Sequence, residues 1–182
     1  LADEWSHACI IVGGRLSRAT QHLFRHNDMD HLRGLLEQQR AGHKRCLIVT
    51  DGVFSMDGDL APVHEMAELA REFDAWLMTD DAHGIGVVGA GGRGSTFAGG
   101  TKAAVDLQMG TLSKAVGGYG GYLCASKAVV DLMKTRCRTL IYSTGLPPAT
   151  VAAAIAALDI IEGDPEYAAR PVKKAQRFTR RL

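Results

Sequence analysis

The chain lacks the features that would place it in several broad classes of protein. It carries 21 Lys and Arg against 20 Asp and Glu, a net charge of +1. This balance predicts neither nucleic acid nor an acidic membrane surface as a partner. No apolar run approaches the roughly 18 residues that a membrane helix needs, and nothing resembles a signal peptide. We therefore expect a cytoplasmic protein that acts on small molecules.

Paired cysteines are also lacking. Cys9, Cys46, Cys124 and Cys137 lie far apart and form no CxxC pair, which predicts free, mostly buried thiols in a reducing compartment. The remaining composition, 46% hydrophobic and 23% charged, is ordinary for a globular protein, and 182 residues suffice for about one domain. The chain starts without Met and stops inside a basic stretch, so we expect a fragment of a longer protein.

Apolar patterns predict strands that alternate with helices. Helical spacing appears at 29–36, 63–73, 127–137 and 148–163, with Pro62 expected at a first helical position. In the last of these helices, one face would carry Val151, Ile155, Leu158 and Ile161. Short apolar runs at 46–50 and 75–79 are typical of strands buried on both faces, and weaker strands are expected at 105–109 and 122–125. Residues 88–101 would form a Gly-rich loop. The fold class predicted is α/β, a mostly parallel sheet sandwiched by helices.

Polar residues follow three of the predicted strands. Asp51 follows the first, Asp80 and His83 the second, and Thr111 and Lys114 the third. Because ligands gather at the carboxyl ends of parallel strands, these groups are expected at one edge of the sheet. Lys114 is embedded in small and flexible residues, and a lysine near a carboxylate and an imidazole can bind an aldehyde cofactor through a Schiff base.

Two other patterns point to different chemistry. Residues 84–89 and again 89–94 match the GxGxxG pattern of Rossmann-type nucleotide binding, but no helical pattern follows the glycines, as that motif requires. His22 and His26 have a spacing that could suit a metal, yet no HExxH context accompanies them. We interpret these two and His31 as solvated or capping histidines, and His43 and His64 as surface residues.

Several motifs together give a recognisable resemblance. Residues 80–84 (Asp-Asp-Ala-His-Gly), 111–114 (Thr-Leu-Ser-Lys) and 53–59 (Val-Phe-Ser-Met-Asp-Gly-Asp) are similar to the α-oxoamine synthases, which are fold type I enzymes dependent on pyridoxal 5′-phosphate (PLP). Further similar stretches are 6–8, 26–28, 141–144 and 146–148. The resemblance runs from about residue 3 to 162, and it implies the large domain of an aspartate aminotransferase-like transferase.

The resemblance implies a PLP site at the predicted sheet edge. Lys114 would hold the cofactor and later move the Cα proton of the bound amino acid. Asp80 would pair with the pyridine nitrogen, because a carboxylate beside a cationic ring favours the charged form. His83 and Ser55 would hydrogen-bond near the phenolic oxygen. His7 would stack on the ring and help to place the substrate.

Hydroxyl groups would complete the phosphate site. Thr111 and Ser113 lie beside the lysine, within reach of a phosphate. Ser143 and Thr144 would serve the neighbouring subunit, since these enzymes resemble obligate homodimers with shared active sites. No metal is implied.

Within the family, the closest match is the member of biotin biosynthesis that condenses L-alanine with a pimeloyl thioester, on CoA or acyl carrier protein, with loss of CO2. A sibling that joins glycine to acetyl-CoA remains an alternative. So do a Rossmann-type module and a non-catalytic subunit that retains the fold.

The chain also departs from the family pattern. Asp51 stands where these synthases usually carry Glu, and the family's upstream phosphate-binding loop and downstream carboxylate-binding arginine fall outside the chain. We expect residues 1–163 to form the PLP-binding large domain without its N-terminal part. Residues 164–182 are expected to form a linker and the start of a C-terminal small domain. The fragment alone is expected to be inactive.

Overall fold

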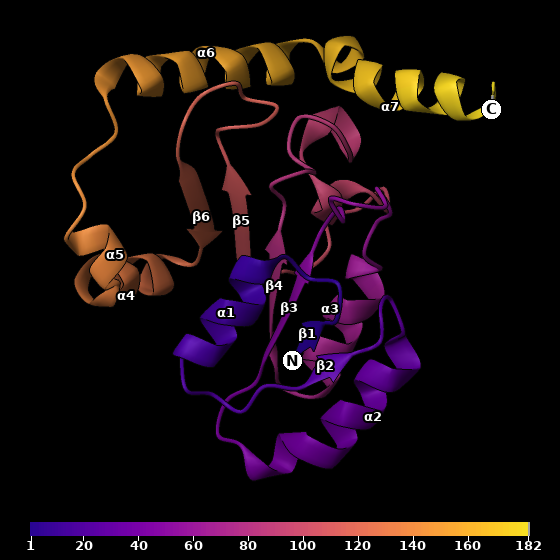
Figure 1. Cartoon of the computed structure of the whole chain (residues 1–182), viewed down its shortest axis with the longest axis vertical. Helices are drawn as coiled ribbons and strands as arrows, with labels where there is room; N and C mark the ends of the chain where they lie inside the picture. Colours follow the sequence, from indigo (N-terminus) through magenta and orange to yellow (C-terminus); the bar gives the residue numbers. More distant parts are fainter. Residues whose placement is uncertain (182) are drawn as a thin grey trace.

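A six-stranded sheet organises the molecule, of which the computed structural model describes residues 1–181 (Figure 1). Its order is β2-β1-β3-β4-β5-β6, and every neighbouring pair is parallel except β5 and β6. The strands are β1 (Ala2–Asp3), β2 (Leu23–Phe24), β3 (Leu47–Asp51), β4 (Trp76–Asp80), β5 (Leu107–Thr111) and β6 (Gly121–Ala125). The mostly parallel α/β sheet predicted from the sequence is confirmed.

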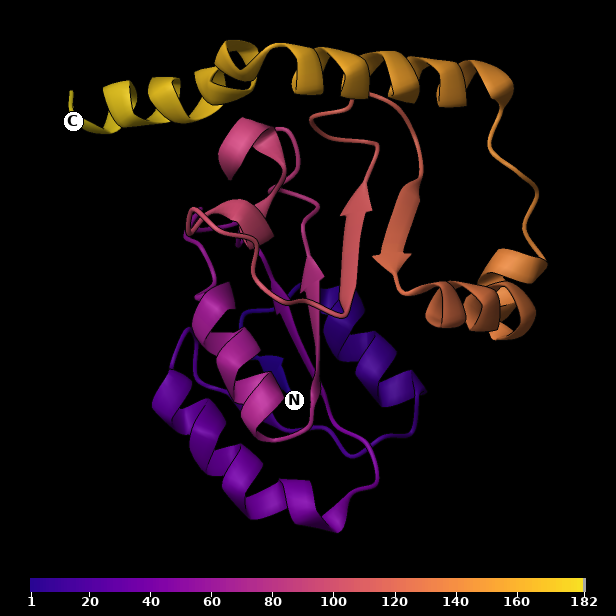
Figure 2. The same cartoon turned by 180° about the vertical axis from the view of Figure 1, so that it is seen from behind.

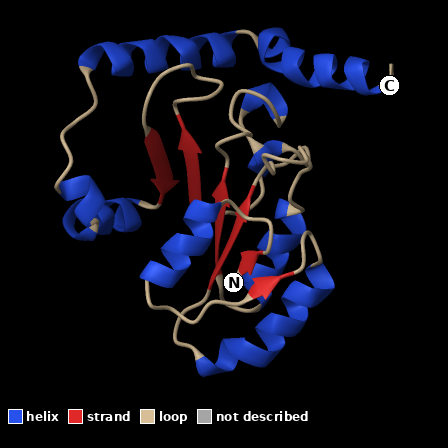
Figure 3. Cartoon of the chain, viewed as in Figure 1, coloured by secondary structure: helices blue, strands red, loops and turns tan. Residues whose placement is uncertain are grey.

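Helices lie on both faces of this sheet, as Figures 2 and 3 show. They are α1 (Ala8–Leu16), α2 (Met29–Gln39), α3 (Val63–Glu72), α4 (Lys127–Arg136), α5 (Arg138–Ile141), α6 (Pro148–Gly163) and α7 (Pro165–Thr179), with 3-10 turns η1 (Arg40–Gly42), η2 (Ala90–Gly92) and η3 (Ser95–Phe97). Helices α2 and α3 pack side by side on one face, and α1 lies on the other (Figure 1).

The main core lies between the sheet and the pair α2 and α3. Ile48 of β3 and Leu77 of β4 are fully buried against apolar side chains of these helices. In α3 the buried positions follow helical spacing, Val63, Met66, Leu69 and Ala70, so the stripe expected from the sequence faces the sheet. Pro62 immediately precedes the helix instead of opening it. Each large apolar side chain buried here contributes roughly 1.5–3 kcal/mol.

The opposite face of the sheet is only partly covered, so the expectation of strands buried on both faces is wrong. Leu47 is 39% exposed and Trp76 46% exposed. Successive side chains of a strand point to opposite faces, and these residues alternate with Ile48 and Leu77. They therefore face the side on which α1 packs, which this helix covers incompletely.

Two boundaries shift for identifiable reasons. Strand β5 was expected at 105–109 but begins at Leu107, because Asp106 instead bonds back to β4, its Oδ2 accepting from the backbone N–H of Leu77 (2.9 Å). The segment from residue 164, expected to begin with a linker, instead starts helix α7. Asp164 caps that helix by accepting a hydrogen bond from the backbone N–H of Tyr167 (3.0 Å). The division into domains at residue 163 stays a prediction.

Helix α6 uses a different face from the expected one. Ala154 and Ile161 are buried in a second cluster with Val116 and Ala168, whereas the other predicted members of that face, Val151, Ile155 and Leu158, are 40–55% exposed. A small residue, Ala154, makes the contact because it lets the helix approach the lysine-bearing loop closely. Helix α6 therefore lies directly over the carboxyl edge of the sheet (Figure 1).

The cysteines are free, but they are not mostly buried. Cys9 and Cys124 are exposed, and Cys46 and Cys137 are partly exposed. Within residues 1–181, no helix is long and apolar enough to cross a membrane.

Candidate active site

The three polar clusters meet at one edge of the sheet. Asp51, Asp80 and Thr111 are the last residues of β3, β4 and β5, and the register pairs Asp51 with Asp80 directly. The ladder continues past the edge, where the backbone N–H of Asp81 donates to the carbonyl oxygen of Met109 (2.8 Å). The expectation of a shared edge is therefore confirmed.

Asp80 is a buried carboxylate with spare hydrogen-bonding capacity. The side chain is 9% exposed, and its Oδ1 accepts from the backbone N–H of Ala82 (2.9 Å). Within residues 1–181, its Oδ2 has no hydrogen-bond partner. A buried carboxylate is stabilised by a cationic donor, so Asp80 suits the protonated nitrogen of a ligand.

The neighbouring Asp81 holds the fold instead. It is fully buried, with Oδ1 accepting from the backbone N–H of Ser95 (2.9 Å) and Oδ2 from the side-chain amide of Gln108 (2.8 Å). Burial raises the pKa of this carboxyl, although the bonds from Ser95 and Gln108 act in the opposite direction. Asp81 thus anchors the loop that follows β4.

That loop explains the GxGxxG matches without a nucleotide. Gly94 has a φ of +94°, and a Cβ at this position would lie 2.7 Å from Oδ2 of Asp81, so only glycine fits. The backbone N–H of Gly86 donates to the carbonyl of Gly92 (2.7 Å), which folds the loop back on itself. A strand–turn–helix unit, which the Rossmann motif requires, is not formed by residues 84–94.

His83 and Lys114 line the same cavity, of about 570 Å³. Burial lowers the pKa of the His83 imidazole, and the nearby Lys114 ammonium lowers it further, whereas Asp80 acts in the opposite direction. His83 is therefore neutral near pH 7 and offers one donor and one acceptor nitrogen.

A tight turn presents Lys114. The Thr111 and Ser113 hydroxyl oxygens are 2.7 Å apart, and the Thr111 hydroxyl also donates to the carbonyl of Gly120 (3.0 Å). The backbone N–H of Gly118 bonds to the carbonyl of Leu112 (2.6 Å) and closes the loop. Both hydroxyls are thereby fixed one to three residues from the lysine.

His7 is the exposed residue at the N-terminus of α1. Its Nδ1 caps this helix by accepting from the backbone N–H of Cys9 (3.2 Å), and its own backbone N–H donates to Oδ2 of Asp51 (2.8 Å). Burial raises the pKa of Asp51 to about 6, against the effect of the His7 hydrogen bond. His7 also lies close enough to influence the pKa of His83.

The remaining predicted residues are less constrained. Ser55 is exposed in the turn that follows β3. Thr144 is exposed in the segment between α5 and α6, where Ser143 donates to the carbonyl of Leu140 (3.3 Å). In the described part of the chain, neither Ser143 nor Thr144 hydrogen-bonds to the edge residues.

Helix α7 supplies site residues that the sequence did not reveal. Tyr167, Arg170 and Lys174 line the cavity that contains His83 and Lys114. They were missed because residues 164–182 were expected to form a linker and the start of another domain. The usable signal was Asp164 followed by Pro165, a helix start.

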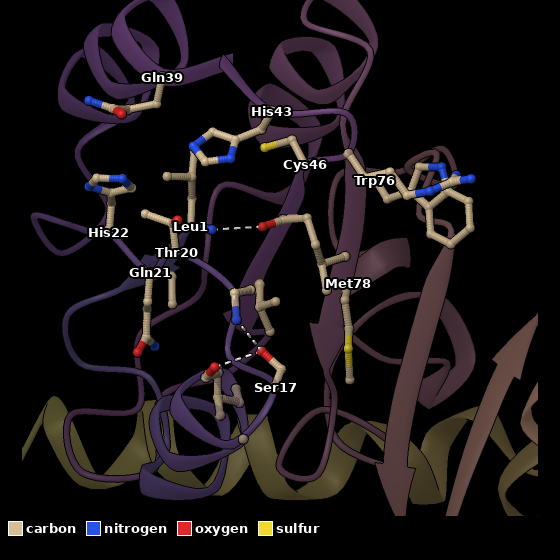
Figure 4. A pocket seen from close by; sticks show the side chains of 18 of the residues that line it. Leu1, Ser17, Thr20, Gln21, His22, Gln39, His43, Cys46, Trp76 and Met78 are labelled. Carbon is tan, nitrogen blue, oxygen red and sulfur yellow. Dashed lines mark hydrogen bonds between the residues drawn. The ribbon is translucent and has the colours of Figure 1, made fainter. Parts of the chain in front are cut away.

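A larger cavity, of about 820 Å³, lies along the incompletely covered face of the sheet (Figure 4). Apolar side chains, including Trp76 and Met78, dominate its lining, which also includes Asp80. Because it contains neither Lys114 nor His83, its size alone does not make it the candidate site. No group of three or more His, Cys, Asp or Glu within residues 1–181 is arranged to hold a metal ion.

The parallel sheet and the lysine turn at its carboxyl edge define the fold of the fold type I PLP-dependent enzymes. The chain belongs to the family of class I and II aminotransferases, whose model matches residues 1–182.

Three individual proteins illustrate what the chain is similar to within this family. The chain is 60% identical over 178 residues to an 8-amino-7-oxononanoate synthase of Methylocella silvestris, covering 98% of this chain and 50% of that protein. A serine palmitoyltransferase from S. paucimobilis, solved with PLP and myriocin bound, is 34% identical with a TM-score of 0.83, covering 88% of this chain and 42% of that one. The 8-amino-7-oxononanoate synthase of Francisella tularensis is 31% identical with a TM-score of 0.72, covering 88% and 46%. The chain spans about half the length of the curated relatives it matches.

Proposed function

We propose that the protein is a PLP-dependent C-acyltransferase that condenses L-alanine with a pimeloyl thioester to give 8-amino-7-oxononanoate and CO2, a step of biotin biosynthesis. The observation that carries the proposal is the cavity shared by Lys114 and His83. The buried carboxylate of Asp80 lines the larger cavity instead, but it lies close enough to His83 to act on the pKa of this histidine, as Lys114 does. The similarity to 8-amino-7-oxononanoate synthases supports the choice of substrates.

The residues at the edge fit PLP chemically. Lys114 offers an amine for the aldehyde, the free Oδ2 of Asp80 suits the protonated ring nitrogen, and the fixed hydroxyls of Thr111 and Ser113 suit phosphate oxygens. When bound, PLP supplies an electron sink for negative charge at the Cα of an amino acid.

The chain's own side chains would bind the cofactor and the amino acid, orient them, and move a proton. The Lys114 amine would remove and return the Cα proton. Asp80 would hold the ring nitrogen in its protonated form, and neutral His83, together with Ser55, would donate near the phenolic oxygen. His7, at the start of α1, would contact the ring and help to position the substrate. Lys114 and His7 are the proposed catalytic residues.

We further propose a cytoplasmic homodimer with shared active sites. Thr144 and Ser143, which have no bonds to the edge residues in their own described chain, would complete the phosphate site of the partner subunit. Condensation of glycine with acetyl-CoA remains the second candidate reaction, because the groups around Lys114 would serve either amino acid.

Covalent trapping tests the cofactor assignment. The protein encoded by the complete gene is incubated with PLP, reduced with borohydride and digested for mass spectrometry. A phosphopyridoxyl group is expected on Lys114, and it should disappear in Lys114→Ala but not in the matched variant Lys134→Ala, which changes an exposed lysine of α4. Labelling spread over many lysines, with Lys114 unmodified, would contradict the assignment.

Substrate pairs test the reaction itself. Product formation is compared for L-alanine with pimeloyl-CoA or pimeloyl-carrier protein and for glycine with acetyl-CoA. We expect the alanine and pimeloyl pair to be favoured and Lys114→Ala to abolish turnover. A preference for glycine and acetyl-CoA would replace the proposed reaction by its sibling.

A further inference from the structure

His26 occupies a position unlike that of a solvated or capping histidine, the role expected from the sequence. Its side chain is 13% exposed and both ring nitrogens face carboxylates, Nδ1 at 3.1 Å from Asp3 Oδ1 and Nε2 at 2.7 Å from Asp59 Oδ2. The ring stacks on Trp5, with centroids 3.9 Å apart, and meets the edge of Phe54 at 4.4 Å.

These contacts join three chain segments that are distant in sequence. Asp3 and Trp5 belong to the segment that leads to His7. Asp59 and Phe54 belong to the turn that carries Ser55.

The Ser55 turn is closed by its own backbone bonds, Phe54 N–H to the carbonyl of Asp59 (3.0 Å) and Gly58 N–H to the carbonyl of Phe54 (2.9 Å). A displacement of Asp59 therefore moves the whole turn.

Asn27 reinforces the same connection. Its backbone N–H donates to Oδ2 of Asp3 (2.9 Å), and its side-chain amide donates to Oδ2 of Asp59 (3.0 Å) and to the carbonyl of Leu60 (3.2 Å). Asp3 is fully buried and also accepts from the backbone N–H of Trp5 (2.9 Å). The network thus combines the fully buried Asp3, the largely buried His26 and the Asp59 side chain, which is 40% exposed. Several hydrogen bonds to each of these side chains favour one geometry.

We infer that His26 is a positioning residue that fixes the Ser55 turn relative to the segment carrying His7, and so holds two walls of the candidate site at a set separation. This inference rests on the proposed function for the roles of Ser55 and His7, but the structural connection itself does not. Within residues 1–181, His26 has no hydrogen bond to Ser55 or His7; it acts through Asp59 and Phe54 on one side and through Asp3 and Trp5 on the other.

The charge of His26 supports the connection. Burial disfavours the imidazolium, but hydrogen bonds to Asp59 and Asp3 outweigh it and raise the pKa of His26. The charged groups that face the residue are Asp3, Asp59 and Glu4, whose Oε1 accepts from the His26 backbone N–H (3.0 Å). Since only the protonated ring donates from both nitrogens, the connection weakens as pH rises through the elevated pKa of His26.

The decisive variant is His26→Phe, which keeps an aromatic ring between Trp5 and Phe54 but removes both nitrogen contacts. The matched control is His64→Phe, which removes a histidine of α3 bonded to the carbonyl of Thr101 (2.9 Å). Both are made in the protein encoded by the complete gene. Amide exchange in the cofactor-free protein should accelerate at 53–60 by about tenfold or more in His26→Phe, with α3 and the His64→Phe control unchanged. Unchanged exchange at 53–60 would overturn the inference.

A double-mutant cycle then tests whether His26 acts through Ser55. His26→Phe should weaken PLP binding by about tenfold in the wild type but by less than about twofold in a Ser55→Ala background, because coupled residues are not additive. Equal effects in both backgrounds would show a general structural role and contradict the inference.

Two failures stay distinguishable. If the wild type binds no PLP, the proposed function fails, while amide exchange still decides the connection. If His26→Phe does not fold, His26→Asn replaces it. Failure of both to fold would assign His26 to folding alone and overturn the positioning role.

Discussion

The backbone N–H of His7 donates to Oδ2 of Asp51 over 2.8 Å, which fixes the start of α1 against the end of β3. The accepting carboxyl is buried, and burial raises its pKa from 3.8 to about 6. One hydrogen bond therefore connects the position of a proposed catalytic residue to a titration close to neutral pH.

Asp51→Asn tests this titration. The folded state holds the Asp51 proton more tightly than the unfolded chain, so the contribution of Asp51 to stability is complete below about pH 4 and is lost as pH rises through about 6. An amide still accepts from His7 but never ionises. The variant should therefore gain on the order of 2 kcal/mol in free energy of unfolding, relative to wild type, between about pH 4 and pH 8. Denaturant titrations at both pH values measure it. If the difference in free energy of unfolding between variant and wild type did not change with pH, the pKa of Asp51 would not be raised in the folded state.

Lys114→Met tests the proximity of Lys114 to His83. The ammonium group helps to hold the pKa of His83 below its usual range, although burial is the larger cause. Removing the charge should raise this pKa part of the way, as measured from imidazole proton shifts in the cofactor-free protein. Lys134→Met, on the exposed surface of α4, should leave it unchanged. If His83 had the same pKa in both variants, Lys114 would not lie close to His83.

Gly94→Ala tests how the loop after β4 is packed. Its φ of +94° and the 2.7 Å approach to Asp81 predict a loss of about 2–3 kcal/mol in free energy of unfolding. Gly91→Ala is the matched control, because Gly91 also has a positive φ, +64°, but open space around it. It should cost only about 1 kcal/mol. Equal losses, measured by thermal and denaturant unfolding, would show that Asp81 does not limit the space.

Ile161→Ala tests the attachment of α6 to the site. Ile161 is 8% exposed, whereas the adjacent Ile160 is 54% exposed. Truncation of the buried residue should cost about 2–4 kcal/mol and make α6 and α7 more sensitive to limited proteolysis. Ile160→Ala should stay within about 0.5 kcal/mol of wild type. Comparable proteolysis of the two variants would contradict the packing described for α6.

The sheet edge could be predicted because its signals are local. Asp80 and Thr111 each end a short apolar run, and the alternation of strands with helices implies parallel strands whose carboxyl ends meet. The prediction that Asp80 and the turn of Lys114 lie at the same sheet edge therefore required no information about contacts between distant residues.

Other features depend on tertiary contacts that no local pattern shows. His26 meets Asp59, 33 residues away, so its burial could not be read from its neighbours in sequence. Trp76 lies in an apolar run that looks fully buried, yet its exposure depends on which helices cover that face. The segment from residue 164 was expected to begin with a linker, but capping by Asp164 and packing of Ala168 favour a helix.

The register that places Asp80 opposite Asp51 also bears on how such sequences can change in length. Side chains alternate along a strand, so deleting one residue within β4 would exchange the directions of Asp80 and Asp81. Both carboxylates would also move by one residue, about 3.3 Å, along the strand. Asp81 would then no longer meet the backbone N–H of Ser95 and the side-chain amide of Gln108 that anchor the loop. Point substitutions in β4 leave these directions intact. Insertions and deletions are therefore expected in the surface connections of this protein's relatives, and the length of β4 is expected to be inherited unchanged.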